Sequence, residues 1–300
     1  MSKVPRVAAI YTIYHPDDGF RHRIRHVVER CTLSVVVDNT PGGHRFATGT
    51  TEGLTVLQDG HNKGLGAALN AGLEEALRQG CEAVVLFDQD SSPHPEFIDA
   101  LFEGLAAAGP RTIVGPLLVD DADADAPAPP SGGSPDLDDV TCLATSGMCF
   151  RLDGLQPSDR FTEDFFLDFV DFDWCWRLRE QGWRICRLRS LPMPHRLGLA
   201  QRSFLGLTYH VPAPFRHYFQ FRDALKLATR RYVPLYSRFR LSLILLPKLL
   251  VYPFLLDRGI ERLRWMLLGI RDAVRSVSGI GAAAVQLQGV SPQPLTSCHP

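Results

Sequence analysis

Two aspartates stand one residue apart where an apolar run of the chain ends. Residues 84–94 read VVLFDQDSSPH, so Asp88 and Asp90 directly follow a segment typical of a buried strand. Two like charges at this spacing repel each other and resist leaving water, which predicts a positive partner between them. The candidates for the space between the two carboxylates are a metal ion, a basic group or simply water. The pair is the first candidate for chemistry in this chain.

A second group of acids lies in the aromatic segment FFLDFVDFDWCWRLREQGW and comprises Asp168, Asp171 and Asp173. Aromatic rings around a carboxylate disfavour its ionised form and raise its pKa towards the range of a general base. Acids are also common in the first turn of a helix, where they favour the positive end of the helix dipole. Both interpretations stay open for Asp173, whereas Asp171 is the preferred candidate for function.

Strand-length apolar runs alternate with helical patterns over the first 120 residues. Strands are expected at residues 7–13, 33–39, 54–59, 83–90 and 112–118, with helices near 18–30, from 63 and from 95. This alternation is typical of an α/β fold with a mostly parallel sheet, in which ligands bind at the carboxyl ends of the strands. A nucleotide is therefore expected beside Tyr14-His15, Asp38-Asn39 and Asp88-Gln89-Asp90, which follow three of these runs.

The segment HNKGLGAALNAGLEEALRQG predicts an amphipathic helix. Asn62 can cap its start, leucines recur every four residues from 65 to 77, and Gly80 follows its end. The small residues Gly66 and Gly72 would admit another segment or a ligand. Packing of this helix on the sheet is favoured over a direct phosphate site.

The composition is that of a globular protein with one large domain, or one domain and an appendage, because 45% of the 300 residues are hydrophobic. The net charge of −1 hides an asymmetry. Residues 1–195 hold 17 basic and 29 acidic side chains, whereas residues 196–300 hold 15 and 4. The basic part could face phosphates, nucleic acid or anionic lipid. Seven cysteines without a CxxC pair, and no apolar run at the start, predict a cytoplasmic protein.

Two segments are distinguished by composition alone. Residues 120–139 are acidic and rich in Pro, Gly and Ala, which predicts a mobile surface loop and not a metal site. The C-terminal part mixes basic and apolar residues, and its longest apolar run, 241–256, is shorter than the ~20 residues that span a bilayer. Helices lying on a membrane surface are expected there, or else a helical cover or homo-oligomer interface. Long aliphatic runs argue against nucleic-acid binding, and Arg216 and Arg222 are candidates for contacting phosphates.

Several motifs occur in a characteristic order between roughly residues 6 and 200: VDN, NKGLGAALNAG, FDQD, TSG, FFLDFVDFDWCWRLREQGW and PHRLG. This order resembles the family 2 glycosyltransferases, most of all their rhamnosyltransferase branch. The resemblance implies a GT-A nucleotide-sugar-binding domain over residues 1–200. The composition of the remaining chain predicts a helical extension over 201–280 and a flexible tail over 281–300. The resemblance also implies an inverting, metal-dependent transfer of a sugar, rhamnose from dTDP-rhamnose. The basic, apolar C-terminal part predicts a saccharide or lipid-linked saccharide acceptor in cell-surface polysaccharide synthesis, with the enzyme in the cytoplasm or peripheral on the inner membrane.

The resemblance also implies roles for matching residues. Asp171 in VDFD matches the catalytic base of the family's EDxD, and Asp168 or Asp173 would support it because Val170 replaces the usual glutamate. His195 in PHRLG would join Asp88 and Asp90 in binding Mg²⁺ or Mn²⁺. The donor would contact Thr12, Tyr14, Asp38, Asn62, Lys63, Asp88, Gln89 and Asp90, and the acceptor side would comprise Ser146, Gly147 and Trp174.

Two functions from other classes stay open. The string FDQDSS also resembles the DxDx[ST] motif of haloacid-dehalogenase phosphatases, in which Asp88 would be the nucleophile. That motif normally follows the first strand of its domain, whereas three expected strands precede it here. A catalytically inactive binding protein of the same fold is the other alternative, and the joint presence of Asp88, Asp90 and Asp171 argues against it.

Overall fold

The computed structural model describes residues 6–44, 54–119, 136–194, 201–204, 207–210 and 212–281. The predicted metal ligand His195 lies outside these residues. So do nearly all of the predicted flexible tail at 281–300 and most of the acidic segment at 120–139.

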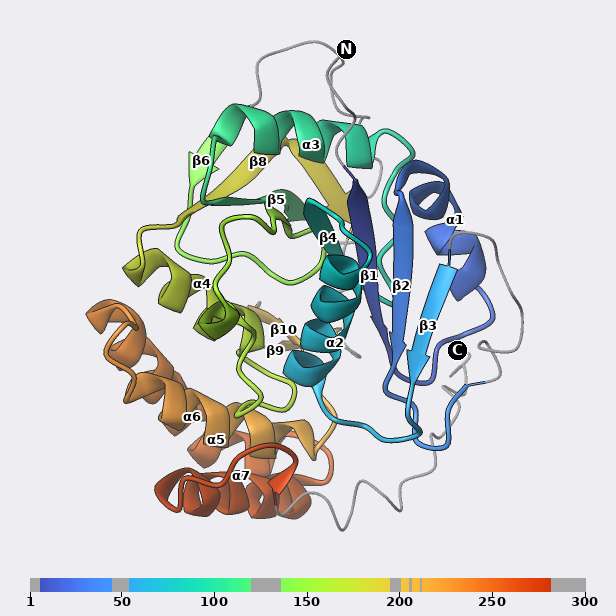
Figure 1. Cartoon of the computed structure of the whole chain (residues 1–300). Helices are drawn as coiled ribbons and strands as arrows, with labels where there is room; N and C mark the ends of the chain where they lie inside the picture. Colours follow the sequence, from blue (N-terminus) through green and yellow to red (C-terminus); the bar gives the residue numbers. More distant parts are fainter. Residues whose placement is uncertain are drawn as a thin grey trace, which may run out of the picture.

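A mixed sheet of eight strands forms the centre of the molecule (Figure 1). Its order is β3-β2-β1-β4-β7-β5-β8-β6. The pairs β1–β2, β2–β3, β1–β4 and β5–β8 are parallel, which confirms the expected mostly parallel sheet. The strands are β1 (Val7–Ile13), β2 (Leu33–Asp38), β3 (Leu54–Gln58), β4 (Ala83–Asp88), β5 (Thr112–Val119), β6 (Leu137–Asp139), β7 (Cys149–Arg151) and β8 (Arg184–Pro194).

Helices cover both faces of the sheet. α1 (Phe20–Arg30) and α3 (Phe97–Ala108) bury their apolar sides in one core cluster, together with Tyr11 and Phe87 from the sheet. α2 (Leu65–Arg78) and α4 (Val170–Glu180) contribute to a second cluster on the other face. The alternation of strands and helices in the sequence therefore produces the layered α/β fold that it predicts.

α2 begins two residues later than expected. Its N-cap is Gly64, and Asn62 instead forms a turn before the helix, with its Oδ1 accepting the Gly64 N–H at 3.0 Å. The glycines of α2 serve packing, as favoured above. A Cβ on Gly72 would lie 2.4 Å from Ile10 of β1, and a Cβ on Gly66 would lie 2.2 Å from the carbonyl oxygen of Thr162.

The end of the acidic segment is ordered, which corrects the prediction of a loop through residue 139. β6 pairs antiparallel with β8, and Asp138 and Asp139 form ion pairs with Arg187 and Arg184 at 2.5 and 2.9 Å. These arginines belong to a strand that was not expected from the sequence. Asp138 and Asp139 are therefore paired with arginines and are not only solvated.

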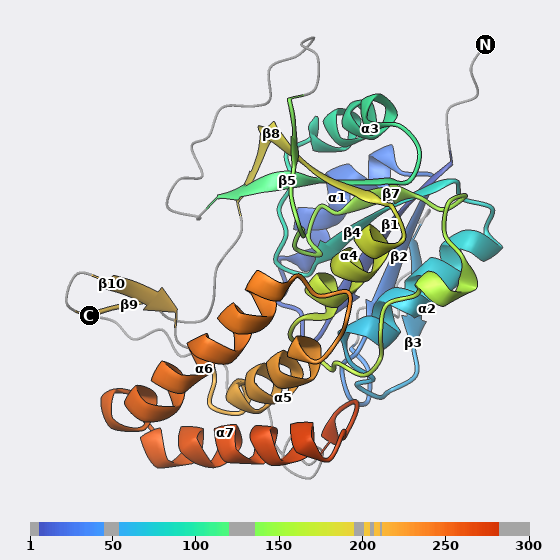
Figure 2. The ribbon, with the colours of Figure 1, turned by 90° about the vertical axis from the view of Figure 1, so that its left-hand side faces the viewer.

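The C-terminal extension starts with a hairpin of β9 (Gln201–Phe204) and β10 (Leu207–His210), where helix was expected. α5 (Arg216–Ala228), α6 (Leu235–Leu255) and α7 (Gly259–Val274) follow and pack on one another beside the sheet domain (Figure 2). α6 continues through Pro247 and Pro253. Within the described parts of the chain, no helix has both the length and the apolar character needed to cross a membrane.

Candidate active site

Three predicted donor residues meet at the carboxyl ends of neighbouring strands. Thr12 of β1 stands in register with Asp88 of β4, and Ile13 stands in register with Asp38 of β2. The parallel sheet therefore brings Thr12, Asp38 and Asp88 to one edge. This is the position at which such sheets bind ligands.

The turn after β4 is fixed by contacts from three directions. Gln89 accepts the Tyr14 N–H through its side chain at 2.7 Å and the Arg23 guanidinium through its backbone oxygen at 2.9 Å. Ser91 accepts the Asp88 N–H at 3.2 Å and shares a hydrogen bond with Ser146. Asp88 is half-buried and Asp90 is exposed at the turn. These hydrogen bonds fix the backbone of the turn that carries the carboxylates of Asp88 and Asp90.

Asp38 organises its own loop. One of its carboxylate oxygens accepts the Thr40 N–H at 2.8 Å, and the other accepts the His44 N–H at 2.7 Å and the Gln58 side chain at 2.9 Å. A pocket of about 550 Å³ lies beside it between β2, β3 and α2, and Lys63 contributes to its lining. Lys63 forms an ion pair with Asp59.

Asp171 lies in the first turn of α4 and has a strongly raised pKa. Loss of water around its carboxyl is the main cause, and the charges of Asp88 and Asp168 add to it. Together they raise this pKa to about 7, against a hydrogen bond from the Phe172 N–H at 2.8 Å. That bond occupies Oδ1. An aspartate poised near neutral pH suits general-base chemistry.

The residue that starts α4 is in an unusual conformation. Phe169 is the N-cap and has a φ of 68°, a left-handed value that is rare for a bulky side chain. Such strain persists only where packing holds it, and it is frequent at functional sites. The Phe169 ring packs edge-on against Phe172 at 5.9 Å. The strained turn sets the direction of the helix that carries Asp171.

The two aspartates flanking Asp171 have different surroundings. Asp168 forms a bidentate ion pair with Arg216 at the start of α5, with a shortest distance of 2.8 Å. Asp173 is buried, accepts the hydroxyl of Tyr232 and lies 3.6 Å from Arg177. Asp168 is therefore at the site together with a cation, whereas Asp173 links α4 to the extension.

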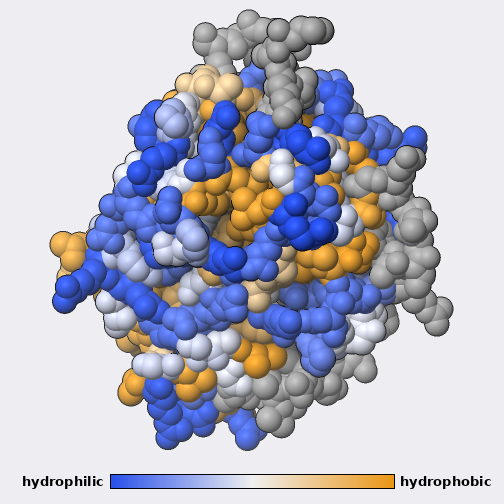
Figure 3. All heavy atoms as spheres, viewed as in Figure 1, coloured by the Kyte–Doolittle hydropathy of each residue, from blue (hydrophilic) through white to orange (hydrophobic). Residues whose placement is uncertain are grey.

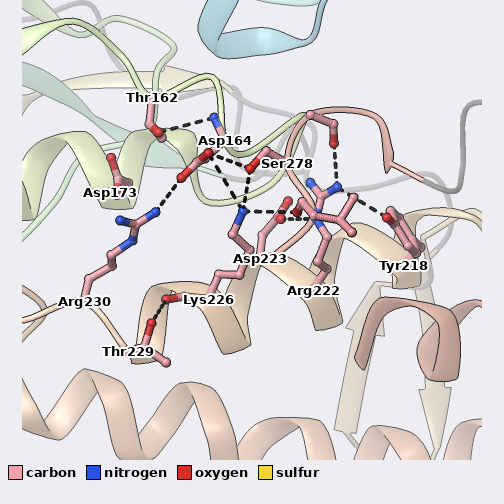
Figure 4. Close-up of polar contacts among 12 residues, drawn as sticks. Thr162, Asp164, Asp173, Tyr218, Arg222, Asp223, Lys226, Thr229, Arg230 and Ser278 are labelled. Carbon is pink, nitrogen blue, oxygen red and sulfur yellow. Dashed lines mark hydrogen bonds and ion pairs between the residues drawn. The ribbon is translucent and has the colours of Figure 1, made fainter. Parts of the chain in front are cut away.

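The extension holds the segment before α4 through Asp164 (Figure 4). Arg230 contacts Asp164 Oδ2 at 2.5 Å, and the Ser278 hydroxyl donates to Oδ1 at 2.7 Å. Lys226 in turn donates to Ser278 Oγ and to the backbone oxygen of Val277 at 3.1 Å each. Burial opposes ionisation of Asp164, but the Ser278 bond and the two cations outweigh it and lower its pKa. This network connects α5 and the residues after α7 to the loop that leads into Asp171.

Arg222 is not available to phosphates, which corrects the sequence-based expectation. Its side chain is fully buried and contacts Asp223 at 2.6 Å and the Gly279 backbone oxygen at 2.5 Å. Arg216 is better placed, because the charges of Asp168, Asp88 and Asp171 outweigh burial and raise its pKa. The helical extension therefore contributes one cation directly to the carboxylate site.

The residues expected on the acceptor side are buried. Ser146 contacts Ser91, and Gly147 donates its N–H to the Leu86 oxygen at 2.7 Å. Trp174 is fully buried, stacks on Phe161 at 4.3 Å and donates its indole N–H to the Asp159 oxygen at 2.6 Å. These placements suit support of the site more than direct contact with an acceptor.

The expected metal ligands Asp88 and Asp90 carry carboxylate oxygens at and just after the end of β4. Asp88, Asp168 and Asp171 bring three carboxylates within electrostatic reach of one another, with Arg216 as a cation beside them. Hard divalent ions prefer oxygen ligands of this kind. The described residues contain no group of three or more His, Cys, Asp or Glu arranged for a metal, and the expected third ligand, His195, lies outside them.

Sequence reasoning missed two cations near the site. Arg23 of α1 binds the turn after β4, and nothing in its helical pattern distinguishes it from its basic neighbours. Lys248 of α6 interacts electrostatically with Asp168, while burial lowers its pKa. A lone lysine within the apolar run 241–256 was a usable signal for it.

A family model and a known protein match this chain in sequence. The model of Glycosyl transferase family 2 matches residues 35–144. The chain is 25% identical to the dTDP-rhamnosyl transferase RfbF of Shigella flexneri over 292 residues, covering 92% of this chain and 97% of RfbF.

Solved structures share the fold at low sequence identity. S. aureus TarS 1-349 in complex with UDP-GlcNAc matches with a TM-score of 0.56 at 14% identity, covering 91% of this chain and 81% of TarS. GalNAc-T7 with UDP, GalNAc and Mn²⁺ matches with a TM-score of 0.50 at 8% identity, covering 81% of this chain and 55% of that one. Residues 35–144 of this chain are thus similar to Glycosyl transferase family 2, nearly the whole chain is similar to RfbF, and its fold is shared with TarS.

Proposed function

We propose that this enzyme transfers rhamnose from dTDP-rhamnose to a saccharide or lipid-linked saccharide in cell-surface polysaccharide synthesis. The observation that carries the proposal is Asp171, an aspartate with a pKa of about 7 that senses the charge of Asp88 at the strand ends. The relative RfbF, named as a dTDP-rhamnosyl transferase, supports the choice of sugar and nucleotide.

The reaction is a single displacement with inversion. The acceptor hydroxyl oxygen bonds to the anomeric carbon while the bond from that carbon to the donor phosphate breaks, and the diphosphate leaves with the electron pair. Asp171 takes the hydroxyl proton on Oδ2, because Oδ1 already accepts the Phe172 N–H. No covalent sugar–enzyme intermediate is needed.

The other residues bind and orient the donor. Thr12, Tyr14 and Asp38 contact the nucleoside, together with Asn62 and Lys63 of the loop before α2. Arg216 is held by Asp168 near the diphosphate and supplies positive charge as the leaving group develops. Asp88, Asp90 and His195 would hold Mg²⁺ or Mn²⁺, which supplies further stabilisation of the leaving diphosphate when bound.

The basic, apolar extension supports contact with a membrane surface. Leucines, phenylalanines and Tyr236 are exposed along α6, and arginines flank them. Interfacial helices bind lipid in this manner, with apolar side chains at the acyl boundary and cations at the headgroups. Alternatively, the same exposed face of α6 binds a second copy of the chain in a homo-oligomer.

The test is turnover of dTDP-rhamnose with a saccharide acceptor, followed by NMR of the product. We expect a product whose anomeric configuration is opposite to that of the donor, formed only with a divalent cation. Retention of configuration would contradict the single displacement. Hydrolysis of simple phosphate monoesters without use of the nucleotide sugar would favour the phosphatase alternative, and donor binding without turnover would favour an inactive binding protein.

A further inference from the structure

A second pocket lies between the end of α4 and the start of α6, which meet at the same edge of the molecule (Figure 1). Its volume is about 440 Å³. Its polar and aromatic lining consists of Arg179, Arg231, Arg238, Glu180, Trp176 and Tyr232, and we call it the arginine pocket. None of these residues belongs to the donor site described above.

The positive charge of the arginine pocket is not neutralised by an ion pair. In the described part of the chain, none of its three arginines forms a salt bridge with a carboxylate. Arg238 is held by backbone oxygens, that of Val233 at 2.9 Å and that of Arg231, so its position is fixed without loss of charge. Glu180 is the one acid in the lining. The pocket therefore favours an anion.

Two further features of the pocket favour an anion with hydrogen-bond acceptors. α6 begins at its wall with Pro234 and Leu235 and has no acid in its first turn, so the positive end of the helix faces it uncompensated. The indole N–H of Trp176 is buried and has no acceptor among the described residues. Buried donors of this kind normally have a partner, and a phosphate oxygen could take that place once a movement of the ring opens the N–H to the pocket.

An exposed apolar face continues from the pocket. Leu235 lines the pocket and is 68% exposed, and large apolar side chains remain exposed along α6 to Phe254. Residues 235–255 contain no acid, and at 1.5 Å per residue the helix is roughly 31 Å long. Figure 3 shows hydrophobic surface beside hydrophilic surface at the edge where α6 begins. The arginine pocket would bind the anionic group of an amphiphilic ligand, and the apolar face of α6 would contact its hydrocarbon chain.

The pocket is also connected to the proposed base. Phe172 follows Asp171, and its ring packs edge-on against Trp176 at 5.4 Å. Arg179 lies eight residues after Asp171 on α4, roughly 12 Å further along the helix axis. At about 100° per residue, Asp171 and Arg179 point roughly 80° apart around the axis of α4. A sugar attached to a group in the pocket could reach the base.

We propose that the arginine pocket binds the phosphate or diphosphate of a lipid-linked acceptor. The lipid chain lies along the exposed face of α6, and the attached sugar extends past Phe172 towards Asp171. This inference rests on the proposed glycosyltransferase function and specifies the acceptor class of the same enzyme.

The test is calorimetric titration of the full chain with farnesyl diphosphate, in the presence of Mg²⁺ and saturating dTDP to keep the donor site occupied. We compare the parent with Arg179→Gln/Arg231→Gln. The matched control, Arg264→Gln/Arg275→Gln, removes two exposed arginines that are outside the pocket. Farnesol and inorganic diphosphate are titrated separately as the two halves of the probe.

We expect farnesyl diphosphate to bind in the presence of dTDP, at least tenfold more tightly than either half. Each charged hydrogen bond lost costs about tenfold, so the pocket variant should bind about 10²-fold more weakly, and the control should stay near the parent. Equal binding by the control and pocket variants, or binding that occurs only when dTDP is left out, would overturn the assignment.

Three other outcomes would assign the pocket differently and also overturn the proposal. Inorganic diphosphate binding as tightly as farnesyl diphosphate would make it a site for a free anion. Arginine-dependent binding to phosphatidylglycerol vesicles without binding of farnesyl diphosphate would make it a general lipid contact. A dimer that dissociates in the pocket variant would make it a subunit interface. Failure of the parent to bind dTDP would instead count against the proposed function.

Discussion

Replacing Asp171 by asparagine removes the proposed base while keeping the size of the side chain. Its Oδ1 accepts the Phe172 N–H, and an amide oxygen can accept that bond as well. The change therefore removes proton acceptance and leaves the first turn of α4 in place. General-base catalysis contributes about 10²–10⁴-fold, so turnover should fall by that factor or more. Binding of dTDP should stay close to the parent's, because a base acts on the acceptor hydroxyl in the transition state.

The pKa of about 7 gives this prediction a pH signature. Asp171 accepts a proton only as the carboxylate, so activity is present above this pKa and is lost as the pH falls through it. The ionised fraction is about nine-tenths at pH 8 and about one-tenth at pH 6, which gives roughly a tenfold loss of turnover between them. Burial is the largest cause of the shift, and it persists when a bound cation neutralises Asp88. The residual activity of Asp171→Asn should lack this step.

Stability measurements show whether the variant is folded. The native state holds a proton on Asp171 between about pH 4 and 7, where the unfolded chain has released it, so this residue lowers stability as the pH rises through that window. Asp171→Asn should therefore melt no lower than the parent at pH 8. Asp168→Asn and Asp173→Asn are the matched controls. Full activity of Asp171→Asn, with loss in one control, would move the base to that neighbour, and full activity of all three would refute the mechanism.

Four further predictions follow from individual contacts. Asp88→Asn or Asp90→Asn should abolish turnover that a chelator inhibits, and near-normal turnover of either variant with chelator present would refute the metal role. Arg222→Met leaves Asp223 buried without its cation and should lower the free energy of unfolding, measured by urea denaturation, by ~3–5 kcal/mol. The control Arg264→Gln should lower it by ~0.5 kcal/mol or less. Equal effects would show that the Arg222–Asp223 pair is unimportant. Gly66→Ala pushes a methyl group against Thr162 and should cost ~1–3 kcal/mol with loss of activity, whereas Ala67→Gly should cost only ~1 kcal/mol with activity kept. The parent should float with anionic vesicles at low salt and not at high salt, whereas indifference to vesicles with a stable dimer in light scattering would favour an oligomer interface.

The first half of the fold could be predicted because its signals are local. The runs at 7–13, 33–39 and 112–118 alternate with amphipathic helices, and β1, β2 and β5 formed close to those bounds. β8 was missed because Arg184, Arg187 and Arg189 break its apolar pattern, and their partners are acids in the segment at 136–139. A strand stabilised by charges from a distant part of the chain has no local signal.

The site could be predicted where it depends on strand ends and motifs. Asp88 and Asp171 were selected from their neighbours in the sequence, and they interact electrostatically in the structure. The sequence did not show which arginine of the C-terminal extension reaches the carboxylate site. Arg216 and Arg222 look alike in the sequence, but packing against α7 buries Arg222 and leaves Arg216 beside Asp168. Only tertiary packing distinguishes them.

The central claim is that this enzyme moves rhamnose from a nucleotide diphosphate, and a donor panel tests it most directly. The full chain is incubated with Mg²⁺ or Mn²⁺, a saccharide acceptor or its lipid-linked form, and a set of nucleotide sugars that includes dTDP-rhamnose. Mass spectrometry should show an acceptor heavier by one rhamnosyl unit, with dTDP released, and no product with Asp171→Asn. Transfer of a different sugar from another donor, with dTDP-rhamnose unused, would contradict the account.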